Sequence, residues 1–138
     1  MKYFFFFASV IVTAAQSADL KCESPKNAPQ KIEITLKGYQ QTREGFEITG
    51  GTLTRTYTPP LASGSKEKRT EHAEFTTEVT AFGMVPVFRT LPAVREGGNQ
   101  TLQQTFILVL YGTIGSPKGI LLSETDGSLK ESALVCAR

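Results

Sequence analysis

Residues 31–37 read Lys-Ile-Glu-Ile-Thr-Leu-Lys, so that polar and apolar side chains alternate without a break. Successive side chains of a β-strand point to opposite faces, and the pattern therefore predicts a strand whose inner face carries Ile32, Ile34 and Leu36. An amphipathic helix would instead bring apolar residues back every three or four positions. The stretch indicates a half-buried sheet, and neighbouring segments show the same period of two.

The segment at 52–58 repeats the alternation, with threonines on one face, where their branched β-carbons favour extended backbone. The opposite, inner face is expected to carry Leu53, Arg55 and Tyr57. Because Arg55 lies on this apolar side, we expect it at the rim of the sheet, with its aliphatic stem buried and its guanidinium in water. Gly50 and Gly51 predict a tight turn that joins this strand to residues 46–49 in a hairpin.

The segment at 71–82 is predicted to be a strand. Residues 71–79 could also be written as a helix capped by Thr70, but the run of Thr and Val favours a strand. The inner face of this strand is expected to carry Ala73, Phe75, Thr77, Val79 and Ala81. Within residues 84–91, Pro86 predicts an edge strand or a bulge. The unbroken apolar run at 106–111 predicts a strand that is covered on both faces.

The segments at 119–123 and 129–136 flank Thr-Asp-Gly-Ser at 125–128, a strong hairpin-turn sequence. The chain thus contains about eight short strand patterns, separated by Gly and Pro turns, and no convincing long helix. This organisation predicts an all-β fold, either an antiparallel β-sandwich or a small barrel. Residues 58–69 show no strand pattern and indicate a surface loop.

The N-terminal 18 residues have the composition of a secretory signal peptide. Lys2 is followed by an apolar run and then by small residues, and cleavage after Ser17 or Ala18 fits the small-residue rule. The apolar run is shorter than the ~20 residues that a membrane span requires. We therefore predict a leader at 1–18 and a single secreted, extracellular β-rich domain at 19–138 that is not anchored in a membrane.

Secretion changes the interpretation of the two cysteines, Cys22 and Cys136. An even pair in an oxidising compartment usually forms a disulfide, which here would join the two ends of the domain. A loop of this length corresponds to about 4–5 kcal/mol in the chain-entropy model. Asn99, followed by Gln100 and Thr101, is an N-glycosylation acceptor in a predicted loop.

Composition argues against several classes of function. With 15 basic and 13 acidic residues, the chain has no electrostatic reason to bind nucleic acid or an anionic membrane. One histidine excludes a multi-histidine metal site, and two cysteines exclude a four-thiolate zinc site. We therefore expect no metal and no cofactor.

The single histidine, His72, is expected to point outward beside Glu74 and Glu78, which argues against acid–base catalysis. No catalytic residue is predicted, and the chain is not expected to be an enzyme. A small secreted hydrolase, a nuclease or a glycosidase, is the first alternative. A carbohydrate-binding module is the second, although the chain has no Trp and only four Tyr to stack on sugar rings.

The leader, a mature chain of about 120 residues, the Cys22 and Cys136 pair and the β-rich pattern together resemble small secreted effectors of filamentous fungi. The resemblance is one of organisation over the whole chain and involves no sequence motif. It implies a binding protein that dampens plant defence, for example by inhibiting a secreted host protease of the papain-like cysteine class. Residues 41–45 (Gln-Thr-Arg-Glu-Gly) differ from the Gln-x-Val-x-Gly loop of cystatins by Arg43, so a cystatin mechanism is not supported.

The predicted contact surface of such an inhibitor is the loop that follows the strand at 52–58. Its residues are Tyr57, Pro59, Pro60, Leu61, Ala62 and Ser63. The two prolines fix φ and keep the preceding residues extended, so that little ordering entropy is lost when the segment docks in a protease cleft. Leu61 and Tyr57 offer an apolar and an aromatic anchor. Alternatively, the prolines only end a strand and the remainder is a connector. The domain is expected to be a monomer.

Overall fold

The computed structural model describes residues 18–58, 68–96, 104–113, 116–125 and 128–138. In these ranges the regular secondary structure is β-strand, and no helix there is long and apolar enough to cross a membrane. Ten strands are present. They are β1 (Ala18–Glu23), β2 (Lys31–Thr42), β3 (Gly45–Glu47), β4 (Gly50–Tyr57), β5 (Arg69–Phe82), β6 (Val85–Thr90), β7 (Val94–Arg95), β8 (Phe106–Thr113), β9 (Ser116–Thr125) and β10 (Ser128–Ala137).

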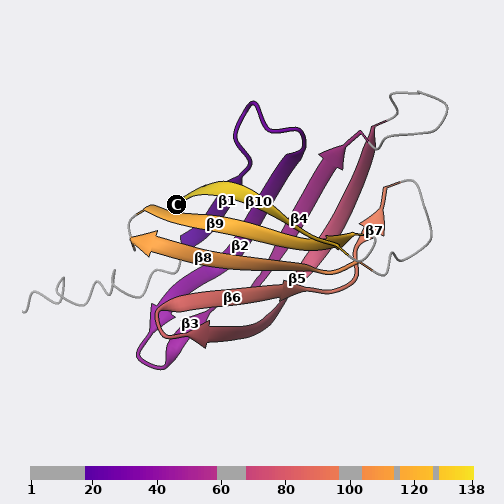
Figure 1. Cartoon of the computed structure of the whole chain (residues 1–138). Coiled ribbons are helices and arrows are strands. Elements are labelled where there is room, and N and C mark those ends of the chain that lie inside the picture. Colours follow the sequence, from indigo (N-terminus) through magenta and orange to yellow (C-terminus); the bar gives the residue numbers. More distant parts are fainter. Residues whose placement is uncertain (1–17, 59–67, 97–103, 114–115, 126–127) are drawn as a thin grey trace, which may run out of the picture.

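Eight of these strands form a closed antiparallel barrel (Figure 1). Around the ring they follow the order β1, β2, β4, β5, β6, β8, β9 and β10, and β10 pairs with β1 again. Each strand therefore pairs with the ring strands that precede and follow it along the chain. A closed ring leaves no unpaired strand edges. The predicted all-β, antiparallel fold of about eight strands is confirmed, and it is a barrel.

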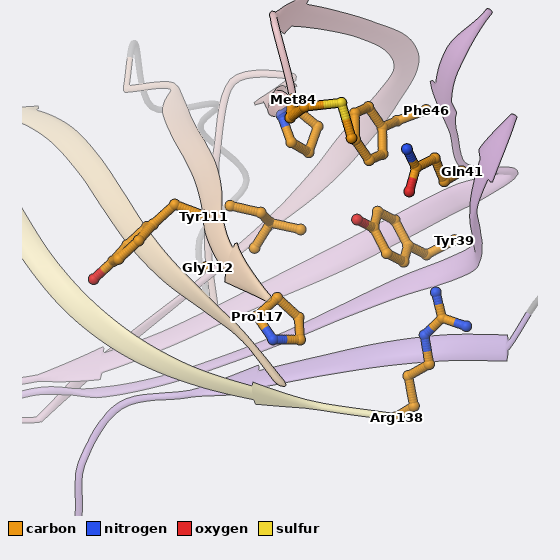
Figure 2. A pocket seen from close by; sticks show the side chains of 10 residues that line it. Tyr39, Gln41, Phe46, Met84, Tyr111, Gly112, Pro117 and Arg138 are labelled. Carbon is orange, nitrogen blue, oxygen red and sulfur yellow. The ribbon is translucent and has the colours of Figure 1, made fainter. Parts of the chain in front are cut away.

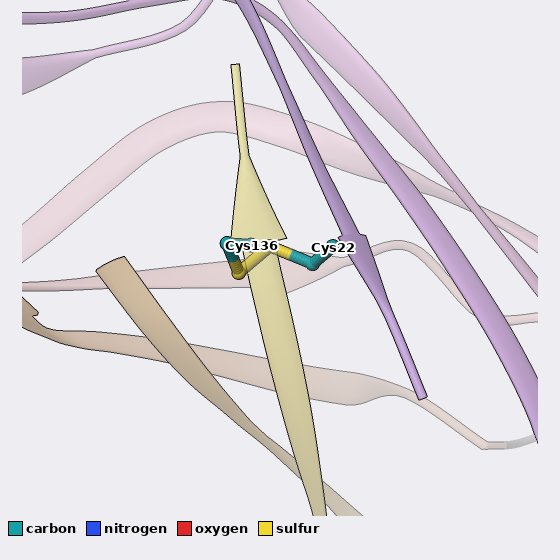
Figure 3. The surroundings of a disulfide bond; sticks show 2 residues. All are labelled: Cys22 and Cys136. Atoms are coloured by element: carbon teal, nitrogen blue, oxygen red, sulfur yellow. A yellow bond between two sulfur atoms is a disulfide. The ribbon is translucent and has the colours of Figure 1, made fainter. Parts of the chain in front are cut away.

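The ring closes at β1, which pairs with β2 on one side and with β10 on the other. Cys22 and Cys136 lie directly opposite each other in the β1–β10 pair, with their Cα atoms 4.0 Å apart, and they form a disulfide (Figure 3). The predicted disulfide is confirmed. It adds a covalent link to the backbone hydrogen bonds that join the first and last strands.

The inner faces of the ring supply one apolar core. The alternation at 31–37 is confirmed, since Ile32, Ile34 and Leu36 are almost completely buried. The other large apolar side chains that are at most 2% exposed are Leu20, Leu53, Phe88, Phe106, Leu108, Leu110, Leu121 and Leu134. They come from β1, β4, β6, β8, β9 and β10, so the core is built by contacts between strands that are distant in the sequence.

The predicted hairpin with a turn at Gly50 and Gly51 is wrong. Both glycines belong to β4, and β3 pairs with β2 instead of β4. Gly51 is buried at a close approach of strands: a Cβ there would lie 2.8 Å from the carbonyl oxygen of Thr35 and 3.3 Å from the ring of Phe75. The sequence signal of a glycine is the same for a turn and for close strand packing, which explains the error.

The strand at 71–82 is confirmed, but its predicted inner face is only half correct. Ala73 and Phe75 are buried, whereas Thr77 and Ala81 are exposed and Val79 is half-buried. The pairing of β5 with β6 shifts register between Phe75 and Val79. Such an irregularity changes which residues of a strand face the core.

Two further expectations are corrected by the closed, single-layered wall. The run at 106–111 forms β8, but only its inner face is covered: Ile107 and Val109 are half-buried, and Tyr111 is exposed. Pro86 lies near the start of β6, which pairs with β5 and β8 and is therefore not an edge strand. The predicted alternative, a bulge, is matched only by the irregularity of the β5–β6 pair, which lies opposite Phe88 and Thr90 and not at Pro86. The predicted hairpin of residues 119–123 with 129–136 is confirmed as the pair β9–β10.

The two mouths of the barrel differ in their connections (Figure 1). At one mouth, here called the loop end, the ring strands are joined through residues 24–30, 58–68 and 91–105. At the opposite mouth, here called the hairpin end, residues 83–84 join β5 to β6, and the β2–β3 hairpin turns at 43–44. Side chains that line a mouth come from many strands, so each mouth can build a site.

We expect the double variant Cys22→Ala and Cys136→Ala to fold into the same barrel but to lose about 3–5 kcal/mol of unfolding free energy, because the link restricts the unfolded chain. Urea unfolding followed by circular dichroism measures the difference. Wild-type protein unfolded in a reducing agent is the matched control and should agree with the double variant. Equal stability of the oxidised wild type and the double variant would contradict this expectation.

Candidate functional site

A buried ion pair lies inside the barrel near the loop end. Arg55 of β4 and Glu71 of β5 are register partners on neighbouring strands, and both side chains face inward. The Nε and Nη2 atoms of Arg55 donate hydrogen bonds of 3.1 and 2.6 Å to Oε2 of Glu71. Arg55 is 7% exposed and Glu71 1% exposed. The expectation that the Arg55 guanidinium reaches water at the rim is wrong, because a buried carboxylate opposite it holds it inside.

Three neighbours complete what we call the Arg55–Glu71 cluster. The hydroxyl of Tyr57 donates a 2.9 Å hydrogen bond to Oε1 of Glu71, and Nη2 of Arg55 donates one of 3.2 Å to Oε1 of Gln104. The guanidinium carbon of Arg55 lies 4.5 Å from the ring centre of Tyr57 and 5.0 Å from that of Phe106, which are cation–π distances. Each carboxylate oxygen of Glu71 therefore has a donor, as a buried charge requires.

The cluster fixes the base of two long connections. Tyr57 and Arg69 form the last register pair of β4 with β5, so residues 58–68 leave and return at adjacent positions of the wall. Gln104 lies just before β8, at the end of the connection that follows β7. The cluster therefore holds Tyr57 and Gln104, the residues next to which these two connections meet the barrel, by hydrogen bonds. Loops whose ends are held on a scaffold in this way are well suited to binding. Its charges neutralise each other, so it presents no free acid or base.

The predicted partner-binding loop begins at this cluster. Tyr57 is half-buried and its hydroxyl is bonded to Glu71. The other residues of the predicted loop, Pro59, Pro60, Leu61, Ala62 and Ser63, lie outside the described residues. The same holds for the glycosylation acceptor Asn99 and for residues 1–17 of the predicted leader.

His72 points outward from β5, as predicted, and its side chain is 51% exposed. Glu74 and Glu78 are exposed as well. The Nδ1 atom of His72 lies 3.3 Å from Oγ1 of Thr54, and its Nε2 atom lies 3.3 Å from Oε2 of Glu96. The order hydroxyl, imidazole, carboxylate is that of an activated nucleophile. The side chains of His72 and Glu96 are largely exposed, however, and water weakens their interaction.

A small pocket opens at the hairpin end, and no sequence pattern indicated it (Figure 2). Its lining residues are Tyr39, Gln41, Phe46, Met84, Pro86, Leu110, Tyr111, Gly112, Pro117 and Arg138. They come from strands that are separated in sequence but adjacent around the ring. Within the described ranges, no group of three or more His, Cys, Asp or Glu side chains could hold a metal ion.

Sequence reasoning missed Glu71 as well. The alternation of side chains along a strand could have indicated it, because Glu71 lies two and four positions from the buried Ala73 and Phe75 and so shares their face of the strand. Arg55 shares a face with the buried Leu53 in the same way. Two opposite charges on inward positions of successive strands could have predicted the pair.

Comparison with known proteins gives no match to a family model, a curated protein or a solved structure.

We expect Glu71→Gln to lower the unfolding free energy by about 3–5 kcal/mol, because the substitution leaves the buried Arg55 charge without a counter-ion. Thermal and urea unfolding measure the loss. The matched control is Glu33→Gln, which removes the partner of an exposed Lys31 ion pair and should cost less than about 1 kcal/mol. Similar losses for the two variants would show that the buried pair is not the constraint described here.

Proposed function

We propose that this chain is a secreted binding protein whose loop end contacts an extracellular host protein. The most specific form of the proposal is inhibition of a secreted host protease, with papain-like cysteine proteases first. The observation that carries it is the Arg55–Glu71 cluster, which anchors the roots of the long connections at one mouth of a covalently closed barrel. A rigid frame that presents loops at one end is a common design of binding proteins.

Two features support secretion. Residues 1–18 have the signature of a cleaved leader, and the Cys22–Cys136 disulfide is of a kind that persists in oxidising compartments. Cleavage after Ser17 would leave all of β1, from Ala18 onward, in the mature domain. The closed ring, which offers no free strand edge in its wall, supports a monomer.

The position of the predicted loop supports an inhibitory role. Residues 58–68 connect two adjacent strands at Tyr57 and Arg69, so both ends of the segment are fixed. Pro59 and Pro60 restrict φ at its start. A segment that is held at both ends and stiffened by proline loses little conformational entropy when it enters a cleft, and more of its contact energy remains as affinity.

A small secreted hydrolase is the second candidate, on one observation. Thr54, His72 and Glu96 lie within hydrogen-bond distance in the order that nucleophilic catalysis uses. Their exposure makes the binding function the better supported of the two, since activated nucleophiles depend on a shielded environment.

We expect the secreted wild-type protein to inhibit a papain-like cysteine protease, and a variant with Pro59, Pro60 and Leu61 replaced by Gly, Ser and Gly to inhibit at least about tenfold more weakly, because the entropic advantage and the apolar anchor are lost. The inhibition constant measures the effect. A variant with Arg43 and Glu44 replaced by Gly and Ser makes a similar change in the exposed turn at the hairpin end and should inhibit like the wild type.

No inhibition by the wild type would contradict the proposed function. Equal inhibition by the wild type and the folded loop variant would contradict the proposed loop but not the function. His72→Ala should keep inhibition within a few-fold of the wild type. If the protein instead shows a hydrolytic activity that His72→Ala reduces by about 10²–10⁴, the second candidate is correct.

A further inference from the structure

The hairpin end carries an apolar pocket that the proposed function does not use (Figure 2). Its walls are built by Phe46, Met84, Pro86, Leu110 and Pro117, and its volume is about 70 Å³. This space exceeds the ~10–15 Å³ needed for one water molecule and is well below the ~300–1,000 Å³ typical of sites for drug-sized ligands. A closed cavity that holds benzene measures ~150 Å³, so this open pocket can enclose a short alkyl chain or one part of a small ring, with the remainder of the ring at its mouth.

The Tyr39 hydroxyl is one of the polar groups that line this pocket, together with the side chains of Gln41 and Arg138. Tyr39 is 8% exposed, and its orientation is fixed by a stacked contact with Phe46 and an edge contact with Phe88, at centroid distances of 6.3 and 6.1 Å. Figure 2 shows the hydroxyl directed into the space between the apolar walls. Within the described residues, no group accepts a hydrogen bond from it. The hydroxyl is therefore available to donate a hydrogen bond to an acceptor on a ligand that enters the pocket.

The charge around the pocket selects the kind of acceptor. The guanidinium carbon of Arg138 lies 5.4 Å from the ring centre of Tyr39 and makes no ion pair with any described residue. None of the lining residues is acidic. Burial raises the pKa of Tyr39, and Arg138 only partly opposes this effect, so the phenol remains a protonated donor at neutral pH.

The rim allows a ligand to enter. Met84 is exposed, and its unbranched side chain adapts to different shapes. Tyr111 also lines the pocket, but Figure 2 shows its hydroxyl directed away from the pocket and from Tyr39. The two tyrosines therefore differ in whether their hydroxyls can bond to a ligand.

We propose that the hairpin-end pocket binds a small apolar monocarboxylate, such as an aryl-substituted acetate. The ring or short chain packs among Phe46, Leu110 and Pro117. One carboxylate oxygen accepts a hydrogen bond from the Tyr39 hydroxyl, and Arg138 at the rim balances the negative charge. This site is separate from the loop end, so it stands whether or not the protein inhibits a protease.

The test titrates phenylacetate into the disulfide-bonded protein, with calorimetry for affinity and amide NMR shifts for location. The shifts should be confined to the hairpin end, including the backbone around Leu110 and Gly112. Phenylacetamide, the neutral analogue, should bind at least about fivefold more weakly. Tyr39→Phe should weaken phenylacetate binding about tenfold, because it removes a hydrogen bond to a charged group.

Tyr111→Phe is the matched control, since it removes a hydroxyl that points away from the pocket, and it should bind phenylacetate like the wild type. Arg138→Gln, a substitution at an exposed position, should remove most of the preference for the acid over the amide. It also keeps the test decisive if Tyr39→Phe does not fold. Absence of binding at millimolar phenylacetate, shifts located at the loop end, unchanged binding by folded Tyr39→Phe, or an unchanged acid preference in Arg138→Gln would each overturn the proposal.

Discussion

The closure of the sheet between its first and last strands is the constraint on which the rest of the structure depends. Backbone pairing of β1 with β10 is reinforced at one position by the Cys22–Cys136 disulfide. Once the ring is closed, each of the eight ring strands has a neighbour on both sides and only one face that can be dehydrated. The apolar side chains must then converge on a single interior, and contact with a partner is left to the two mouths and to the outer face of the wall.

The interior changes character along the barrel axis. Its middle is apolar, with Leu53 and Leu108 fully buried, whereas the loop end encloses the Arg55–Glu71 pair. Two charges can be removed from water at tolerable cost only if their hydrogen bonds are satisfied, and removing one partner of such a pair leaves an uncompensated buried charge. Here its hydrogen bonds join β4, β5 and Gln104, two residues before β8. The platform at the loop end is therefore polar inside and rigid.

The two mouths offer different chemistry because different kinds of connection reach them. Long connections start from the Arg55–Glu71 cluster at the loop end and can present a surface to a protein. Tight turns at the hairpin end leave the mouth open between aromatic and proline side chains, and the Tyr39 hydroxyl lies there without a protein partner among the described residues. The mouths of β-barrels are frequent sites for small ligands. The continuous core between the mouths keeps the two sites apart.

Alternation and cysteine content determined the class of this fold: strands at 31–37 and 52–58, an antiparallel arrangement and a disulfide between Cys22 and Cys136 follow from local pattern alone. The tertiary structure decided which strands pair, that Gly51 serves close packing, that Glu71 meets Arg55, and that Tyr39 faces a pocket. Alternation reports which side of a strand is buried but not what lies opposite. That partner comes from a distant segment of the chain, and only the closed ring brings the two together.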